Sequence, residues 1–195
     1  MRLTGLQKIL WVAAGIATLA YGALLLRPAP APVAEAPFRP TFALADDAGT
    51  LRTSAEFAGK YLLVFFGFTN CPDICPTTLS EVAQVMDDLG ADAAKVQPIF
   101  ISIDPERDRR LGLKEFTDAF HPAILGLAGT EAETRSAAES FKIFFEREAD
   151  GSAPDGYSMS HSPGLFLVGP DGAWIRQFTY GTAAADILSD LRSRF

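Results

Sequence analysis

The chain has 195 residues, which is enough for one ordinary domain with a tail but not for two hydrophobic cores. Because 48% of the residues are hydrophobic and 21% are charged, the composition excludes a chain that is disordered throughout and a low-complexity or collagen-like repeat. A formal net charge of −7 argues against a nucleic-acid partner, and two cysteines with two histidines are too few for a zinc ribbon or a disulfide-rich scaffold.

The first segment of the chain, residues 1–27, is predicted to be a membrane anchor. Residues 9–26 contain no charged side chain, while Arg2 and Lys8 precede them and Arg27 follows. As a helix this run would span about 27 Å at ~1.5 Å per residue, close to the ~30 Å hydrocarbon core of a bilayer. A cleaved secretory signal is the alternative, but the run is longer than the usual apolar part of such a signal. The basic flank would stay in the cytoplasm, so the rest of the chain would be exported.

A spacer is expected to follow at residues 28–40, which include five prolines and four alanines. This composition favours an extended, semi-rigid segment over a packed element. It would hold a single domain, residues 41–195, away from the membrane surface. The predicted arrangement is therefore an inner-membrane anchor with the domain in the periplasm, where cysteines can be oxidised.

Strand and helix patterns alternate through this domain. The continuous apolar run at 61–67 is typical of a central strand covered on both faces. Thr130 and Glu133 form a capping-box pattern, and Gly-Pro-Asp-Gly at 169–172 predicts a hairpin turn. Strands are expected in a hairpin around 42–51 and at 61–67, 96–103, 124–128, 165–168 and 173–178. Helices are expected at 76–89, 111–120, 130–145 and 183–194. The order predicts an α/β layered sheet with flanking helices and an antiparallel edge.

Both cysteines lie between the first buried strand and the helix that follows it, in Cys71-Pro-Asp-Ile-Cys75. Cys75 is expected at the helix amino terminus, where the helix dipole and free N–H groups stabilise a thiolate. Three intervening residues put the two sulfurs within reach of each other or of one metal ion. A structural disulfide here would close too short a loop to stabilise the fold much, so a reactive or metal-ligating role is favoured.

A third donor would decide between redox chemistry and metal binding, and His161 is the candidate. It lies just before the strand expected at 165–168, and a layered sheet can bring that point to the same end as the cysteine loop. From the residues alone, a histidine in a surface loop is an equal alternative. Two thiolates with one imidazole suit Cu(I), and an added oxygen donor could then hold Cu(II), whereas a structural zinc site normally has four protein ligands.

Several other side chains are weaker candidates. Asp73 lies between the cysteines and is either a modulator of their pKa or a solvated loop residue. Asp104 and Asp108 follow the second buried strand and reach the same sheet edge, but turn formation and helix capping explain them equally well. Met159 could supply a thioether ligand, although a single methionine is more often a packing residue.

Four segments resemble the Sco/SenC family, whose members are membrane-anchored, thioredoxin-fold proteins that help to assemble the Cu(A) centre of cytochrome c oxidase. The matching segments are F-x-F-T-x-C-P-x-x-C-P at 66–76, Ile-Ser-Ile-Asp-Pro at 101–105 with Asp108 beyond, the segment from Tyr157 to Ser162, and 169–172. The resemblance implies a thioredoxin-like fold in which His161 approaches the cysteines. It also implies that Cys71, Cys75 and His161 bind one copper ion per chain.

This resemblance predicts a copper metallochaperone, and the cysteine pair leaves a thiol–disulfide reductase activity open. Its partners would be the oxidase subunit that carries the Cu(A) site, a copper donor and a thiol reductant. Two departures bear on this prediction: Ser160 stands where the family often has aspartate, and Pro163 stands where thioredoxins have a cis-proline. The second favours the alternative function, a thiol–disulfide oxidoreductase that reduces the cysteines of a partner's metal site. A peroxiredoxin-like role is disfavoured, because Pro72 occupies the position that such sites give to threonine.

Overall fold

The computed structural model describes residues 4–25, 36–153 and 155–195. It divides into two units, Met1–Ala36 and Pro37–Phe195, and each is described by itself. Most of the predicted spacer, residues 28–35, lies outside the described residues.

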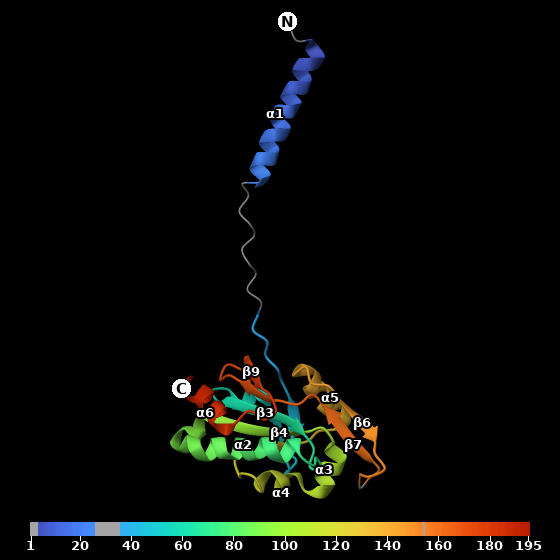
Figure 1. Cartoon of the computed structure of the whole chain (residues 1–195), viewed down its shortest axis with the longest axis vertical. Helices are drawn as coiled ribbons and strands as arrows, with labels where there is room; N and C mark the ends of the chain where they lie inside the picture. Colours follow the sequence, from blue (N-terminus) through green and yellow to red (C-terminus); the bar gives the residue numbers. More distant parts are fainter. Residues whose placement is uncertain (1–3, 26–35, 154) are drawn as a thin grey trace. The chain divides into compact units, whose positions relative to one another are not determined.

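The described part of the first unit is a single helix, α1 (Gly5–Leu25) (Figure 1). Its segment Gly5–Leu24 is long and apolar enough to cross a membrane, judged by length and composition, and none of it is buried. The helix begins four residues before the uncharged run and so includes Lys8 in its first turn. These properties are consistent with the predicted anchor.

The second unit is built on a five-stranded sheet with the order β5-β4-β3-β8-β9 (Figure 1). Strands β3, β4 and β5 run parallel, and β8 and β9 continue the sheet antiparallel. Two further pairs, β1–β2 and β6–β7, lie outside it. The strands are β1 (Ala43–Ala45), β2 (Leu51–Thr53), β3 (Tyr61–Gly67), β4 (Val96–Ser102), β5 (Leu125–Leu127), β6 (Phe145–Ala149), β7 (Tyr157–His161), β8 (Leu165–Val168) and β9 (Trp174–Phe178).

Helices connect these strands and cover the sheet. In chain order they are the short 3-10 helix η1 (Ser54–Phe57), α2 (Ile74–Leu89), η2 (Gly90–Lys95), α3 (Pro105–Leu111), α4 (Leu113–Asp118), α5 (Glu131–Ser140) and α6 (Ala184–Arg192). Helix α5 has the predicted capping box, because the Thr130 hydroxyl and the Glu133 carboxylate each accept a bond from the other residue's backbone N–H. The predicted α/β layered sheet with flanking helices and an antiparallel edge is confirmed.

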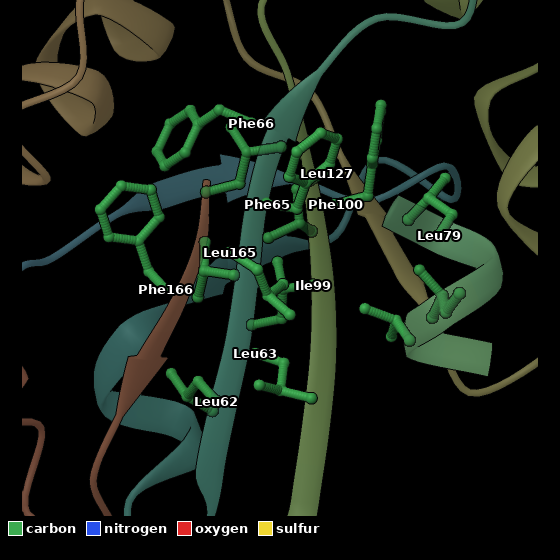
Figure 2. Packing of buried hydrophobic residues seen from close by; sticks show 14 of the residues in the cluster. Leu62, Leu63, Phe65, Phe66, Leu79, Ile99, Phe100, Leu127, Leu165 and Phe166 are labelled. Atoms are coloured by element: carbon green, nitrogen blue, oxygen red, sulfur yellow. The ribbon is translucent and has the colours of Figure 1, made fainter. Parts of the chain in front are cut away.

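The central strand β3 is apolar on both faces because both faces are covered. Figure 2 shows Phe65 beside Phe100 on the side of Leu79 from α2, and Phe66 beside Phe166 on the opposite side. Phe66 also meets Phe141, which follows α5, with ring centroids 5.3 Å apart. Burying such a side chain contributes about 1.5–3 kcal/mol. The strand is thus fixed firmly, and the loop after Gly67 starts from a rigid edge.

Two predicted helices are wrong in their bounds. The helix expected at 111–120 is instead α3 and α4, separated by Gly112, whose positive φ of 88° breaks the helical path. The helix expected to reach residue 145 ends at Ser140, and Lys142 has a left-handed φ of 58°. The chain then turns into the unpredicted hairpin β6–β7, in which Phe145 pairs with His161. Residues 146–149 are polar or small and exposed, so pairing with β7 determines their structure and local propensity does not.

Candidate functional site

The two cysteines lie at the carboxyl end of β3, as the sequence predicted. A turn closed by the bond from Cys71 N–H to Phe68 O leads into α2, which begins two residues earlier than expected. Cys75 is therefore in the first turn of that helix and is fully buried, whereas Cys71 lies before the helix and is partly exposed. Both thiols are free, and the Cys75 N–H donates to Cys71 Sγ over 3.4 Å.

The electrostatics of this pair correct the sequence prediction, because Cys71 and not Cys75 is the stabilised thiolate. The Cys75 thiol, helped by the N–H groups of Cys75, Asp73 and Ile74, lowers the pKa of Cys71 to about 6 despite partial burial. The same thiol contact, together with burial, raises the pKa of Cys75. The reason is directional: the free N–H groups of a first turn point back out of the helix, toward the residue that precedes it.

This asymmetry predicts selective alkylation of the reduced, metal-free protein. Iodoacetamide is expected to modify Cys71 with a rate that rises through a midpoint near pH 6, because the thiolate is the reacting form and lies partly exposed. Cys75 is expected to stay unmodified through neutral pH. Mass mapping of the labelled peptide at each pH measures both. Equal labelling of the two cysteines, or a midpoint above pH 8, would contradict the assignment.

The depth of Cys75 depends on Gly67. A Cβ at position 67 would lie 2.8 Å from Cys75 Sγ and 2.9 Å from ring carbons of both Phe65 and Phe100. Only glycine therefore leaves room for the sulfur at this point. Cys75 Sγ is held between the last residue of β3 and the aromatic core.

His161 is the last residue of β7 and is half-buried against the aromatic rings at the end of β3. Its ring centroid lies 6.1 Å from that of Phe65 and 6.4 Å from that of Phe68, both edge-on. Its Nδ1 lies 3.0 Å from Ser162 O, and since a carbonyl can only accept, Nδ1 carries the proton. Burial lowers the His161 pKa, which favours the neutral ring. Nε2 is then left with a lone pair, the form of imidazole that binds metals.

The structure brings His161 and the cysteine loop to the same end of the sheet through one shared residue, Phe68. The Phe68 ring meets His161, and the Phe68 N–H faces Cys75 Sγ. In residues 4–25, 36–153 and 155–195, no three Cys, His, Asp or Glu side chains are clustered closely enough to hold a metal ion. His161 is thus a neighbour of the cysteine pair and does not form a preassembled three-ligand cluster with it.

Neither of the two aspartates that follow β4 caps α3 through its side chain, so the capping part of the alternative is wrong. Asp104 occupies the capping position without a side-chain capping bond. Asp108 is fully buried and accepts bonds from Thr69 N–H (3.0 Å), the Thr69 hydroxyl (2.8 Å) and the Ser102 hydroxyl (2.6 Å). Burial raises the pKa of Asp108, and those three bonds oppose the rise. Asp108 therefore fixes the chain two residues before Cys71.

Asp104 belongs to a buried polar cluster that the sequence did not reveal. Its carboxylate lies 2.6 Å from Arg107 Nε, and the side chains of both residues are at most 1% exposed. The Tyr157 hydroxyl donates to both carboxylate oxygens at 3.1 and 3.0 Å. The sequence indicated this cluster only through its three close arginines, at 107, 109 and 110. It did not show that Arg107 is the buried one of the three.

The remaining candidates have minor or packing roles. Asp73 is exposed and accepts from the Tyr180 hydroxyl at 3.3 Å. Met159 is partly buried against the core, as expected for a packing residue. Pro163 accepts a bond at its carbonyl from Gln177, and its peptide bond is trans, as are all peptide bonds in the described residues. Its similarity to the thioredoxin cis-proline is one of position and not of bond geometry.

Comparisons with known proteins agree on one family. The family model described as SCO1/SenC matches residues 30–195. An SCO2-like protein from Rickettsia felis is 34% identical over 151 residues, which cover 77% of this chain and 74% of that protein. The structure of Bradyrhizobium japonicum ScoI with copper bound is 34% identical with a TM-score of 0.71, covering 81% of this chain and 99% of that one. BsSco is described as a member of the Sco family of cytochrome c oxidase assembly proteins with a disulfide switch. It is 27% identical with a TM-score of 0.63, and the match covers 82% of this chain and 96% of that one.

Proposed function

The chain belongs to the SCO1/SenC family, and from this membership we propose that it binds one copper ion through Cys71, Cys75 and His161 and delivers it to the Cu(A) site of cytochrome c oxidase. The family is associated with copper binding and with assembly of that oxidase. Delivery would take place on the exported side of the inner membrane, with α1 as the anchor.

The observation that carries the proposal is the free cysteine pair with one stabilised thiolate. Thiolate sulfur and neutral imidazole are the donors that suit copper, Cu(I) above all. Cys71 offers a thiolate near neutral pH, and Nε2 of His161 offers a lone pair because Nδ1 bonds Ser162 O. The donor chemistry of these residues therefore fits the ion.

Capture would begin at Cys71, since its sulfur is the more exposed and the more readily ionised of the two. Cys75 would follow and lose its proton to solvent, because a ligating thiol must be deprotonated. His161 would then move from the Phe65 and Phe68 rings toward the sulfurs as the third ligand. Release would proceed by ligand exchange, in which a thiolate of the acceptor protein binds the ion before the ligands of this chain leave.

An anaerobic copper titration of reduced residues 37–195 tests the proposal, with wild type beside His161→Ala. We expect the wild type to bind one copper ion per chain. We expect His161→Ala to bind copper more weakly but still to form the Cys71–Cys75 disulfide on oxidation. Bound Cu(I) and Cu(II) are counted per chain after removal of free metal. Unchanged retention in His161→Ala would remove the histidine from the ligand set, and no tight binding in the wild type would overturn the function.

A thiol–disulfide oxidoreductase is the second candidate, and the unequal pKa values of the two cysteines favour it. The Cys71 thiolate would attack a partner's disulfide and release one partner thiolate, leaving a mixed disulfide. The Cys75 thiol, losing its proton, would then attack the Cys71 sulfur, releasing the second partner thiol and leaving a Cys71–Cys75 disulfide. A separate thiol reductant must restore the pair. This function needs neither copper nor His161, so the same titration distinguishes it.

A further inference from the structure

Helix α3, with Asp104 before it, lies between the two parts of the candidate site. On one side Asp108 accepts two bonds from Thr69 and so holds the loop that carries the cysteines. On the other side Asp104 and Arg107 hold Tyr157, the first residue of β7. One short segment of chain therefore contacts both the cysteine loop and the strand that ends at His161.

Tyr157 is held at three points. Its hydroxyl donates to both carboxylate oxygens of Asp104, and its carbonyl accepts a bond from Arg107 Nη1 at 3.2 Å. The guanidinium groups of Arg107 and Arg147 each lie 4.2 Å from its ring centroid. These contacts hold the Tyr157 ring in one position and orientation, so the start of β7 has little freedom to shift.

Two routes lead from this cluster to His161. Along β7, side chains alternate, so Tyr157 and His161 lie on the same face of the strand. Through space, the Arg107 guanidinium lies 5.6 Å from the Phe68 ring centroid, and Phe68 packs edge-on against His161. Arg107 therefore contacts Tyr157, which begins the strand that carries His161, and Phe68, which packs against the His161 ring.

The burial of Arg107 also argues for a positional role. Its side chain is 1% exposed, and within the described residues neither its Nε nor its Nη2 makes a hydrogen bond, although Nε lies 2.6 Å from the Asp104 carboxylate. A buried ion pair with an unsatisfied donor stabilises a fold poorly compared with apolar residues of similar volume. What it provides here is a defined geometry between α3 and β7.

We propose that the cluster of Asp104, Arg107 and Tyr157 is a positioning device that sets where His161 stands relative to Cys71 and Cys75. It thereby governs the third ligand of the copper ion, and in this respect the inference rests on the proposed function. The three residues touch neither the metal nor the sulfurs. They act through Phe68 and through the strand that carries the histidine.

The test is Tyr157→Phe, which keeps the ring between its neighbours but removes the bifurcated hydrogen bond that the hydroxyl donates to the two carboxylate oxygens of Asp104. We expect copper affinity to fall by up to about 10-fold, the lower end of the range for groups bonded directly to a ligand, because Tyr157 acts on His161 indirectly, and we expect an altered Cu(II) absorption spectrum. Tyr61→Phe is the matched control, because its hydroxyl also donates one bond, to Arg194 O at 3.0 Å, at the opposite end of β3. It should change neither readout. Arg147→Lys, at an exposed position, keeps the charge but removes the planar group over the ring, so it should lower copper affinity by less than Tyr157→Phe does.

A second measurement separates positioning from general weakening of the fold. In a His161→Ala background, Tyr157→Phe is expected to cause no further loss of copper affinity, because the residue it acts through is gone. An equal loss in both backgrounds would overturn the proposal. So would unchanged ring-proton NMR shifts of His161 in metal-free Tyr157→Phe. The NMR measurement needs no copper. If the wild type binds no copper, the proposed function fails, but the NMR shifts of His161 still test the positioning role.

Discussion

Replacing Cys71 with serine is expected to weaken Cu(I) binding more than the loss of a group bonded to a metal ligand does. Such a loss typically weakens binding by about 10–100-fold. Serine has the shape of cysteine, but its oxygen is a hard donor and stays protonated at neutral pH, so the ion loses its first thiolate. The variant also removes the only sulfur whose pKa lies near 6. Anaerobic titration in competition with a chromogenic Cu(I) chelator measures the change.

Asp73→Asn is the matched control for that experiment. Asp73 lies between the cysteines, is exposed and has nearly the shape of asparagine, so the variant removes a charge from the same loop without removing a sulfur. We expect its copper affinity to stay within a few-fold of the wild type. A Cys71→Ser variant that binds copper as tightly as Asp73→Asn would rule out Cys71 as a ligand.

Replacing Arg107 with methionine is expected to lower the free energy of unfolding by about 3–5 kcal/mol, the cost of removing one partner from a buried ion pair. The carboxylate of Asp104 would remain fully buried. It would keep only the Tyr157 hydroxyl and Arg147, whose Nη2 lies 3.7 Å away. Urea denaturation of the reduced, metal-free domain measures the loss.

Arg110 offers a control on the same helix, three residues further on. It pairs with Asp155 at 3.1 Å, but its side chain is 63% exposed. Exposed pairs contribute about 0–1 kcal/mol, so Arg110→Met should leave the denaturation midpoint nearly unchanged. Equal losses of unfolding free energy in Arg107→Met and Arg110→Met would contradict the stabilising role assigned to the buried pair of Arg107 with Asp104.

The parts of the fold that could be predicted from the sequence are those set by local pattern. The apolar run of β3, the capping box of Thr130 and Glu133 and the turn at 169–172 each depend on neighbouring residues. The cysteine pair was also visible, because its chemistry is carried by two residues four positions apart. Its placement at the end of β3 followed directly from the order of strand and helix.

What could not be predicted depends on contacts between distant segments. The strand β6 has a polar, helix-favouring sequence, and only its pairing with β7 makes it extended. Asp108 meets Thr69 across 39 residues, and Arg107 meets Tyr157 across 50, so no local pattern connects them. The direction of the first-turn N–H groups also decided which cysteine is ionised, and composition says nothing about that direction.

Because Cys75 packs behind Gly67, the two sulfurs differ in their access to solvent. Solvent reaches Cys71, while Cys75 Sγ is enclosed by the end of β3 and by the rings of Phe65 and Phe100. A thiolate arriving from solvent would therefore reach the Cys71 sulfur before the Cys75 sulfur. If the chain carries copper as proposed, we expect the partly exposed Cys71 sulfur to be displaced before the buried Cys75 sulfur. Capture would follow the same path in reverse, beginning at Cys71, and a small reagent that cannot displace Cys75 would not remove the ion.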